Sequence, residues 1–185
     1  MSAWTDHVAR WKDCTACALC NQRSNIVLAR GKVPCDLLFV GEAPGQSEDA
    51  LGQPFVGPAG QLLDQIIANA VPPDIRFALT NLVACFPAEA KARGDNEPEL
   101  SEIQACRPRL RDFIGLAKPR LIVCVGTLAS DYIHHDAGGQ VMGAEVVTIT
   151  HPASILRMPL AQKQMAVQRS IVTVRNAVQD YLLQS

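Results

Sequence analysis

The stretch from Cys35 to Asp64 constrains the fold of this chain more than any other. It opens with four apolar residues, 37–40, whose length and flanking turn residues are typical of a buried strand. A loop rich in glycine and proline follows, and a helical pattern begins at Gln61. A strand that enters such a loop and then a helix presents backbone N–H groups at the carboxyl edge of a sheet, where open α/β folds bind their ligands.

The side chains of this loop favour a flat, neutral ligand over a phosphate. The loop carries three acids, Glu42, Glu48 and Asp49, and one aromatic residue, Phe55, which we expect to be exposed. A phosphate-binding loop would place a lysine here, and the pattern GxxxxGK[ST] does not occur. We therefore expect the loop to hold an uncharged ring.

Strands and helices alternate along the rest of the chain. Apolar runs predict strands over 37–40, 77–83, 121–125 and 145–150, and helical spacing predicts helices over 3–13, 61–70, 98–117, 128–135 and 162–183. This order predicts an α/β fold with three layers, α/β/α, around a central, mainly parallel four-stranded sheet. No repeat or linker interrupts the 185 residues, so we expect 1–185 to form a single domain.

Composition limits the compartment and the partners. The formal net charge of −1 is not the basic signature of a nucleic-acid-binding protein, so any such contact must depend on a local patch. The apolar runs are too short to span a membrane, and the N-terminus has no signal-peptide core, so we expect a cytoplasmic protein without membrane contact. Seven cysteines in such a chain favour metal ligands and buried thiols over disulfides.

Three cysteines near the N-terminus, Cys14, Cys17 and Cys20, are each separated by two residues. Two thiolates at this spacing can bind one metal centre from a tight turn, which is compatible with zinc, an iron–sulfur cluster or a redox pair. A thioredoxin-like βαβ pattern does not begin here, which disfavours the redox pair. Cys35 and Cys124 flank or lie in predicted strands, where we expect them to pack in the core.

Several chemically useful residues fall at the ends of different predicted strands. Gly41–Glu42, Asn81 and His151 each come at or directly after the carboxyl end of a strand. Because these ends share one edge of a parallel sheet, we expect them to line one pocket together with Phe55. Taken singly, Asn81 as a strand cap, His151 as a turn residue and Phe55 as core are simpler interpretations. Their joint position favours a site.

These side chains together match a pyrimidine base. The amide of Asn81 offers a donor and an acceptor side by side, as the N3–H and O4 edge of such a base requires. A neutral His151 would donate to O2 and stabilise the negative charge of the departing base, and an aromatic ring would stack on it. The set predicts cleavage of an N-glycosidic bond, by a route that needs neither a metal nor a nucleotide cofactor.

Several motifs carry a family resemblance. They are Gly41-Glu42-Ala43-Pro44-Gly45, Glu48-Asp49, Gly52-x-Pro54-Phe55-Val56-Gly57-x-Ala59-Gly60, Thr80-Asn81-x-Val83-x-Cys85, Cys106-Arg107-Pro108 and His151-Pro152-Ala153. In these motifs and their order, over nearly the whole chain, the sequence resembles the family 4 uracil-DNA glycosylases, the iron–sulfur branch of the uracil-DNA glycosylase superfamily. The resemblance implies a monomeric DNA repair enzyme that removes uracil from single- or double-stranded DNA, the first step of base excision repair.

The resemblance also implies a role for each matching residue. Cys14, Cys17, Cys85 and Cys106 would ligate a 4Fe–4S cluster, with Cys20 spare although its spacing rivals that of Cys17. Phe55 would stack on the flipped uracil, Asn81 would read its polar edge, His151 would donate to O2, and the backbone of Gly41, Glu42 and Ala43 would complete the pocket.

Two further groups of residues have roles outside base recognition. In a wedge loop after His151, Leu156 would fill the gap in the base stack and Arg157 would hold a phosphate, while Ile155 is expected to be core. The strong aspartate base of related glycosylases is replaced by Ala43, so Glu48 is the candidate for positioning water, with Glu42 behind it.

One segment departs from the family pattern. After Cys85 the family has Arg-Pro-Pro and then Asn-Arg, whereas this chain has Phe86-Pro87-Ala88 and extra residues over 89–96. Two alternatives therefore stay open: a glycosylase of the same fold for another modified or deaminated base, in a phage or defence setting, and a non-catalytic nucleic-acid-binding relative. An unrelated iron–sulfur or zinc protein is a more distant alternative. The covalent-trapping branch is not indicated, because no arginine-rich insertion precedes a histidine.

Overall fold

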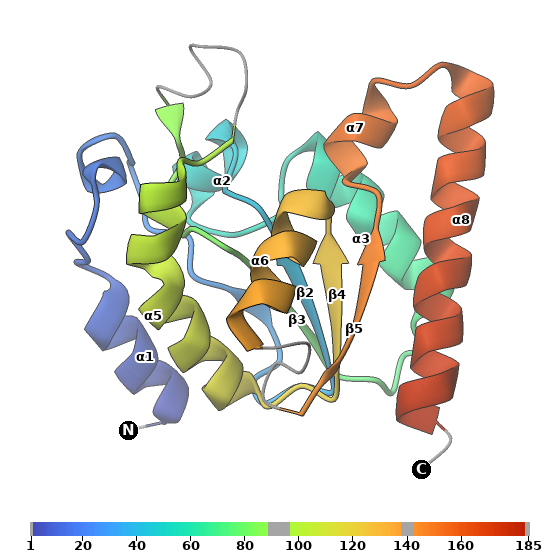
Figure 1. Cartoon of the computed structure of the whole chain (residues 1–185), viewed down its shortest axis with the longest axis horizontal. Helices are drawn as coiled ribbons and strands as arrows, with labels where there is room; N and C mark the ends of the chain where they lie inside the picture. The colour runs from blue at the N-terminus through green and yellow to red at the C-terminus, as the bar shows by residue number, and fades with distance from the viewer. Residues whose placement is uncertain (1, 89–96, 138–142, 184–185) are drawn as a thin grey trace.

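The computed structural model describes residues 2–88, 97–137 and 143–183. At its centre is a five-stranded sheet in the order β1-β3-β2-β4-β5 (Figure 1). Its strands are β1 (Arg30–Gly31), β2 (Leu37–Gly41), β3 (Phe77–Asn81), β4 (Leu121–Val125) and β5 (Glu145–Ile149). The four longer strands pair in parallel, whereas β1 pairs antiparallel with β3. The predicted α/β class is confirmed, but the count of four strands omitted β1, because two residues carry no strand pattern of their own.

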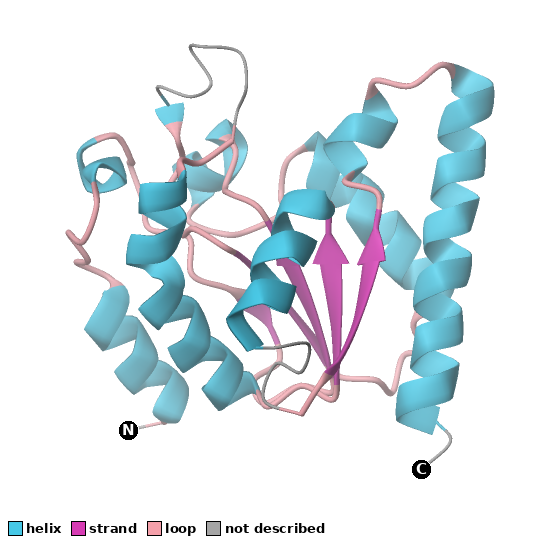
Figure 2. Cartoon of the chain, viewed as in Figure 1, coloured by secondary structure: helices cyan, strands magenta, loops and turns pink. Residues whose placement is uncertain are grey.

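Helices cover both faces of the sheet in the predicted three layers (Figures 1 and 2). On one face lie α5 (Leu100–Ala117) and α6 (Thr127–Ala137), and α1 (Ala3–Trp11) packs against α5. On the other face lie α3 (Pro58–Ala70) and α8 (Leu160–Val178), which continues into a π-helical turn, η2 (Gln179–Leu183). A 3₁₀ turn, η1 (Ala18–Asn21), lies in the cysteine segment.

The central strand β2 supplies side chains to both layers of the core. Leu38 and Val40 pack toward α5 and α6, whereas Leu37 and Phe39 pack toward α3 and α8. All four are fully buried, and each such side chain stabilises the fold by about 1.5–3 kcal/mol relative to exposure. A strand buried on both faces gives the continuous apolar run that the sequence shows.

The strand order creates a topological switch point at the centre of the sheet. From β2 the chain passes first to β3 on one side and then crosses to β4 on the other. Ligands of open α/β sheets bind at the carboxyl ends of the strands beside such a point. Two short helices, α2 (Gln46–Leu51) and α7 (Pro152–Leu156), lie at this edge together with the start of α6 (Figure 1).

Some predicted boundaries differ from the structure. Helix α2 occupies part of the expected loop, where Gly45 is its N-cap and Gly52, at φ +69°, is its left-handed C-cap. Helix α3 begins at Pro58, since proline suits the first helical turn. The predicted wedge segment after His151 is largely helical, as α7. Among the described residues, no helix has the length and apolar character needed to cross a membrane.

Candidate active site

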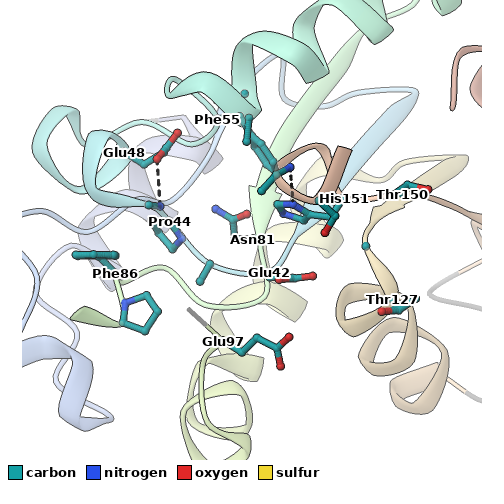
Figure 3. Close-up of a pocket in the computed structure, with 18 of the residues that line it drawn as sticks. Glu42, Pro44, Glu48, Phe55, Asn81, Phe86, Glu97, Thr127, Thr150 and His151 are labelled. Carbon is teal, nitrogen blue, oxygen red and sulfur yellow. Dashed lines mark hydrogen bonds between the residues drawn. The ribbon is translucent and has the colours of Figure 1, made fainter. Parts of the chain in front are cut away.

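A pocket of about 710 Å³ opens at the carboxyl edge of the sheet (Figure 3). Four strand ends contribute to its lining: Glu42 after β2, Asn81 at the end of β3, Gly126 after β4 and His151 after β5. Phe55 joins them from the loop before α3. The structure therefore brings together the residues that the sequence placed at one edge, beside the topological switch point.

Asn81 and Phe55 meet over Gly41. In the parallel pair of β2 and β3, Gly41 lies opposite Asn81. A Cβ atom at position 41 would lie 2.5 Å from Asn81 Oδ1 and 2.5 Å from Phe55 Cζ, so only glycine leaves room for both side chains. Phe55 was expected to be exposed, but only 7% of it is accessible. Its ring packs against Gly41 at the floor of the pocket.

The backbone of Phe55 is held in an unusual conformation. Its φ of +58° lies in the left-handed region, which costs energy for an aromatic residue. A Cβ at Gly60 would lie 1.9 Å from the Phe55 carbonyl oxygen, so the tight turn also requires glycine at position 60. Strain of this kind persists only where the surrounding structure supports it.

Two charged side chains supply that support, one by accepting from backbone N–H groups and the other by donating to backbone carbonyls. Glu48 Oε1 accepts hydrogen bonds from the N–H groups of Val56 (2.8 Å) and Gly57 (2.7 Å), and its Oε2 accepts one from Gly45 N–H (3.1 Å). Arg30 of β1 donates from Nε to the Pro54 carbonyl (2.8 Å) and from Nη2 to the Phe55 carbonyl (3.2 Å). Glu48 and Arg30 thus clamp the turn that carries Phe55.

His151 is a neutral imidazole of defined tautomer. It is the N-cap of α7, where its Nδ1 accepts a hydrogen bond from the Ala153 N–H at 3.1 Å (Figure 3). Burial lowers the pKa of His151 to about 4, and the nearby cation of Arg157 lowers it further. A neutral ring whose Nδ1 is an acceptor carries its proton on Nε2, so Nε2–H is available as a donor.

Glu42 lies beside His151, with Gly126 between them. A Cβ at Gly126, whose φ is +102°, would lie 2.6 Å from Glu42 Oε1 and 3.2 Å from His151 Cβ. Burial raises the pKa of Glu42 to about 7; the carboxylate of Glu97 also raises it, and Arg157 lowers it. In the described part of the chain, its carboxylate accepts no hydrogen bond. Glu42 is therefore poised to titrate near neutral pH.

Five of the seven cysteines gather in a second cavity, on the α1–α5 side of the sheet. Cys14, Cys17, Cys20, Cys85 and Cys106 line it. Burial raises the pKa of Cys17, and the charges of Cys106, Glu102 and Cys14 raise it further. Cys35 and Cys124 are buried in the core, as predicted.

The cysteines that line this cavity supply the thiolate donors that a metal centre requires. Among the described residues, no three cysteine, histidine or acidic side chains are arranged to hold one metal ion. In a 4Fe–4S cluster each thiolate binds a different iron, so its ligands lie farther apart than those of one zinc ion. In addition, Arg23 Nη1 donates to Cys85 Sγ at 3.2 Å, a contact that stabilises a thiolate.

Of the two predicted DNA-contacting residues, Arg157 lines the pocket, and Leu156 precedes it at the end of α7. Leu156 ends α7 with 36% of its surface exposed, Arg157 follows it and is exposed, and Ile155 is fully buried. Phe86 and Glu97 line the pocket at either end of the atypical segment. The extra residues predicted to alter this segment, 89–96, lie outside the described residues.

Sequence reasoning missed two residues that shape the site. Arg30 lies in a strand of only two residues, and its contact with the Phe55 turn depends on β1 pairing with β3. Gly126 was not assigned to the site, although its place directly after the predicted strand 121–125 was a signal of the same kind as that for Gly41.

The sequence is similar to a known protein family and to several of its members. The family model for the uracil DNA glycosylase superfamily matches residues 29–173. A type-4 uracil-DNA glycosylase of Pyrobaculum aerophilum is 34% identical over 165 residues, which cover 80% of this chain and 82% of that protein. The type-4 uracil-DNA glycosylase of Archaeoglobus fulgidus is 29% identical, over 89% of this chain and 88% of that protein. That of Thermotoga maritima is 31% identical, over 80% of each.

Two solved structures share the fold at low sequence identity. The SMUG2 protein of Pedobacter heparinus has a TM-score of 0.53 and 14% identity, over 79% of this chain and 76% of that chain. A putative uracil DNA glycosylase from Methanosarcina acetivorans has a TM-score of 0.51 and 14% identity, over 83% and 97%. On the family match and the identity to these relatives, the chain belongs to the uracil-DNA glycosylase superfamily, among its type-4 members.

Proposed function

We propose that the protein is a monofunctional glycosylase that hydrolyses the N-glycosidic bond of uracil in DNA, the first step of base excision repair. One observation carries the proposal: Phe55, Asn81 and a neutral His151 with its proton on Nε2 line the same pocket. These are the groups that stack on a pyrimidine, read its polar edge and stabilise its anion. We further propose that residues 1–185 act as one monomeric domain.

The pocket recognises the base by stacking and by its hydrogen-bonding edge. The buried Phe55 ring provides the stacking surface, and the Asn81 amide offers an acceptor for N3–H and a donor for O4. The backbone from Gly41 to Ala43 completes the pocket beside them. A base that presents a different edge leaves a buried amide group unpaired, which is the origin of discrimination.

His151 stabilises the leaving group. As the bond between C1′ and N1 breaks, its electron pair moves onto the uracil ring and negative charge builds on O2. The Nε2–H of His151 donates to that oxygen as a neutral donor held in place by the Ala153 contact. A preorganised donor of this kind is worth about 10²–10³ in rate.

Two carboxylates were candidates for positioning the attacking water. Glu48 already accepts three backbone hydrogen bonds, so we assign it to bracing the Phe55 turn. Glu42 has no such partner among the described residues and lies beside His151. We therefore assign the water-positioning role to Glu42, whose anion would also stabilise the positive charge that develops on the sugar.

The nucleotide must leave the helix to reach this pocket. Extrusion costs a few kcal/mol and favours weakly paired or single-stranded targets. Leu156, exposed at the end of α7, would fill the gap left in the base stack, and Arg157 would contact a phosphate.

We also propose that Cys14, Cys17, Cys85 and Cys106 ligate a 4Fe–4S cluster. They come from three separate segments: the chain after α1, the chain after β3, and helix α5. The bound cluster would supply a cross-link that holds these segments together, so its binding energy contributes to folding. The chemistry at the base is carried out by the pocket residues.

Base release from a defined oligonucleotide tests the proposal. Purified, iron-loaded protein is incubated with DNA that carries one uracil, as a single strand and opposite guanine or adenine, and abasic sites are cleaved by alkali. We expect cleavage at the uracil, reduced at least about a hundredfold in Asn81→Ala but unchanged in Asn176→Ala, an exposed asparagine on α8. A folded, iron-loaded protein that releases no uracil would refute the assignment and direct attention to other modified bases.

A further inference from the structure

Arg109 is a fully buried arginine between the cysteine cavity and the pocket. Only 1% of it is exposed. It follows Cys106 by three positions on α5, so the two residues share a face of the helix with the buried Leu110 and Phe113. It lines the cavity that the five cysteines surround. A buried arginine in such a place requires an explanation in terms of its partners.

The guanidinium of Arg109 binds the end of β3. Its Nη1 donates to Thr80 Oγ1 at 2.9 Å, and its Nη2 donates to the carbonyl oxygens of Asn81 (2.6 Å) and Leu82 (2.8 Å). Thr80 Oγ1 in turn donates to the Leu28 carbonyl at 2.7 Å. Three consecutive residues are thus tied to one rigid, planar group, and the middle one is Asn81.

The opposite edge of the guanidinium lacks partners among the described residues. No ion pair within the described ranges involves Arg109, and its buried Nε has no hydrogen-bond partner. A buried cation without a counter-charge is strongly unfavourable. The cavity that Arg109 lines is the one assigned to the cluster, and a 4Fe–4S core with four thiolates is an anion.

We propose that Arg109 is a positioning residue that links the cluster to Asn81. The inference rests on the proposed function, because it takes the cluster and the uracil-reading amide from there. The anionic cluster provides the counter-charge that allows a guanidinium to be buried, and the guanidinium holds the main chain on which the Asn81 amide is carried. Arg23, which donates to Cys85, supplies a second cation at the cluster.

This arrangement gives the cluster a role in excision without any electron transfer. Loss of the cluster would leave the Arg109 charge uncompensated, and the guanidinium would then tend to leave its position against β3. Asn81 would lose its support even though no pocket residue had changed.

Two substitutions separate the charge of Arg109 from its geometry. Arg109→Gln removes the charge, whereas Arg109→Lys keeps a charge but cannot form the three-way contact. Arg169→Gln, at an exposed position on α8, is the matched control. For each variant we would measure iron content, iron loss to a chelator, the reduction potential of the cluster by voltammetry, and the single-turnover rate of uracil release.

We expect the two variants to differ at the cluster and to agree at the pocket. Arg109→Gln should lower the reduction potential and speed iron loss, because a neighbouring positive charge favours the more negative, reduced cluster. Arg109→Lys should keep both near the parental values. Excision should fall between about tenfold and a hundredfold in both variants, with unchanged affinity for product DNA, since a loosened Asn81 impairs the reaction geometry.

The possible outcomes are distinct. A parental reduction potential and parental iron retention in Arg109→Gln would overturn the counter-charge role. A parental excision rate in iron-loaded Arg109→Lys would overturn the positioning role. If Arg109→Gln does not fold, the excision rate of Arg109→Lys still tests the positioning role. If the parental protein loads iron but releases no uracil, the proposed function fails, while the potential and iron measurements still test Arg109.

Discussion

His151 should remain neutral far below the pH at which an ordinary histidine becomes charged. Burial, together with Arg157, lowers its pKa to about 4. At pH 5.5 such a pKa leaves roughly 97% of the imidazoles neutral, whereas the usual value of about 6.5 would leave only about 9%. Protonation would place a hydrogen on Nδ1, where it would face the Ala153 N–H and force the ring out of position. Protonation of His151 should therefore affect the rate of base release only at low pH.

The titration of Glu42 must be removed before this effect can be seen. Its pKa of about 7 should make the excision rate of the parental enzyme rise between pH 6 and 8, as the carboxylate that positions water becomes charged. Replacement by glutamine should lower the rate and remove this step. In the Glu42→Gln background, the remaining rate should then stay constant within about twofold from pH 8 to 5 and fall only as the pH approaches 4.

Two measurements would check this prediction. Single-turnover excision from a single-stranded oligonucleotide gives the pH profile, and ¹⁵N NMR of the histidine side chains gives the tautomer and the pKa directly. A midpoint near 6.5 in both experiments would show that His151 is an ordinary exposed imidazole and would refute the reasoning. In the parental background, His151→Gln should cost about 10²–10³ in rate, and His134→Gln, on the exposed side of α6, should cost nothing.

Three further predictions follow from the same structure. Glu42→Gln should stabilise the protein at pH 8 by about 1–3 kcal/mol, because a folded-state pKa raised to about 7 means that stability is lost as the pH rises through 7. Thermal melts of the parental protein and the variant at pH 5 and pH 8 measure this gain. An equal gain at both pH values would contradict the prediction. Glu48→Gln should lower the free energy of unfolding by about 1–3 kcal/mol and slow excision, because one of the two carboxylate oxygens that accept backbone hydrogen bonds is lost. An unchanged melting temperature and an unchanged excision rate would contradict the bracing role. Cys17→Ser should abolish the visible absorption of the cluster. Cys20→Ser should retain it, because the Cys20 thiol donates to the neighbouring Asn21 side chain. The reverse result would make Cys20 the ligand in place of Cys17.

Much of the fold followed from local patterns. The apolar runs over 37–40 and 121–125 lie within strands buried on both faces, and their alternation with helices was enough to predict a mainly parallel sheet with three layers. The two-residue strand β1 escaped detection because its pairing depends on β3, which lies far along the chain. Helix α2 escaped because six residues between two glycines are too short for a periodic signal.

Much of the candidate site followed from topology. Asn81 and His151 were expected at one edge because parallel strands place their carboxyl ends together, and the structure brings them to one pocket. The choice between Glu42 and Glu48 could not be made from the sequence. Glu48 binds backbone groups up to nine positions away, and Glu42 lies beside a glycine that follows a different strand.

The sequence by itself determined which chemical groups are present and in which order strands and helices occur, because propensity and hydrophobic period act over a few residues. Only the tertiary structure decided the protonation and the partners of those groups. The pKa values of Glu42 and His151 come from burial and from charges on other elements, and Arg109 reaches the Asn81 carbonyl across 28 positions of sequence. Desolvation and hydrogen bonding depend on what surrounds a group in space, and that environment exists only once the chain has folded.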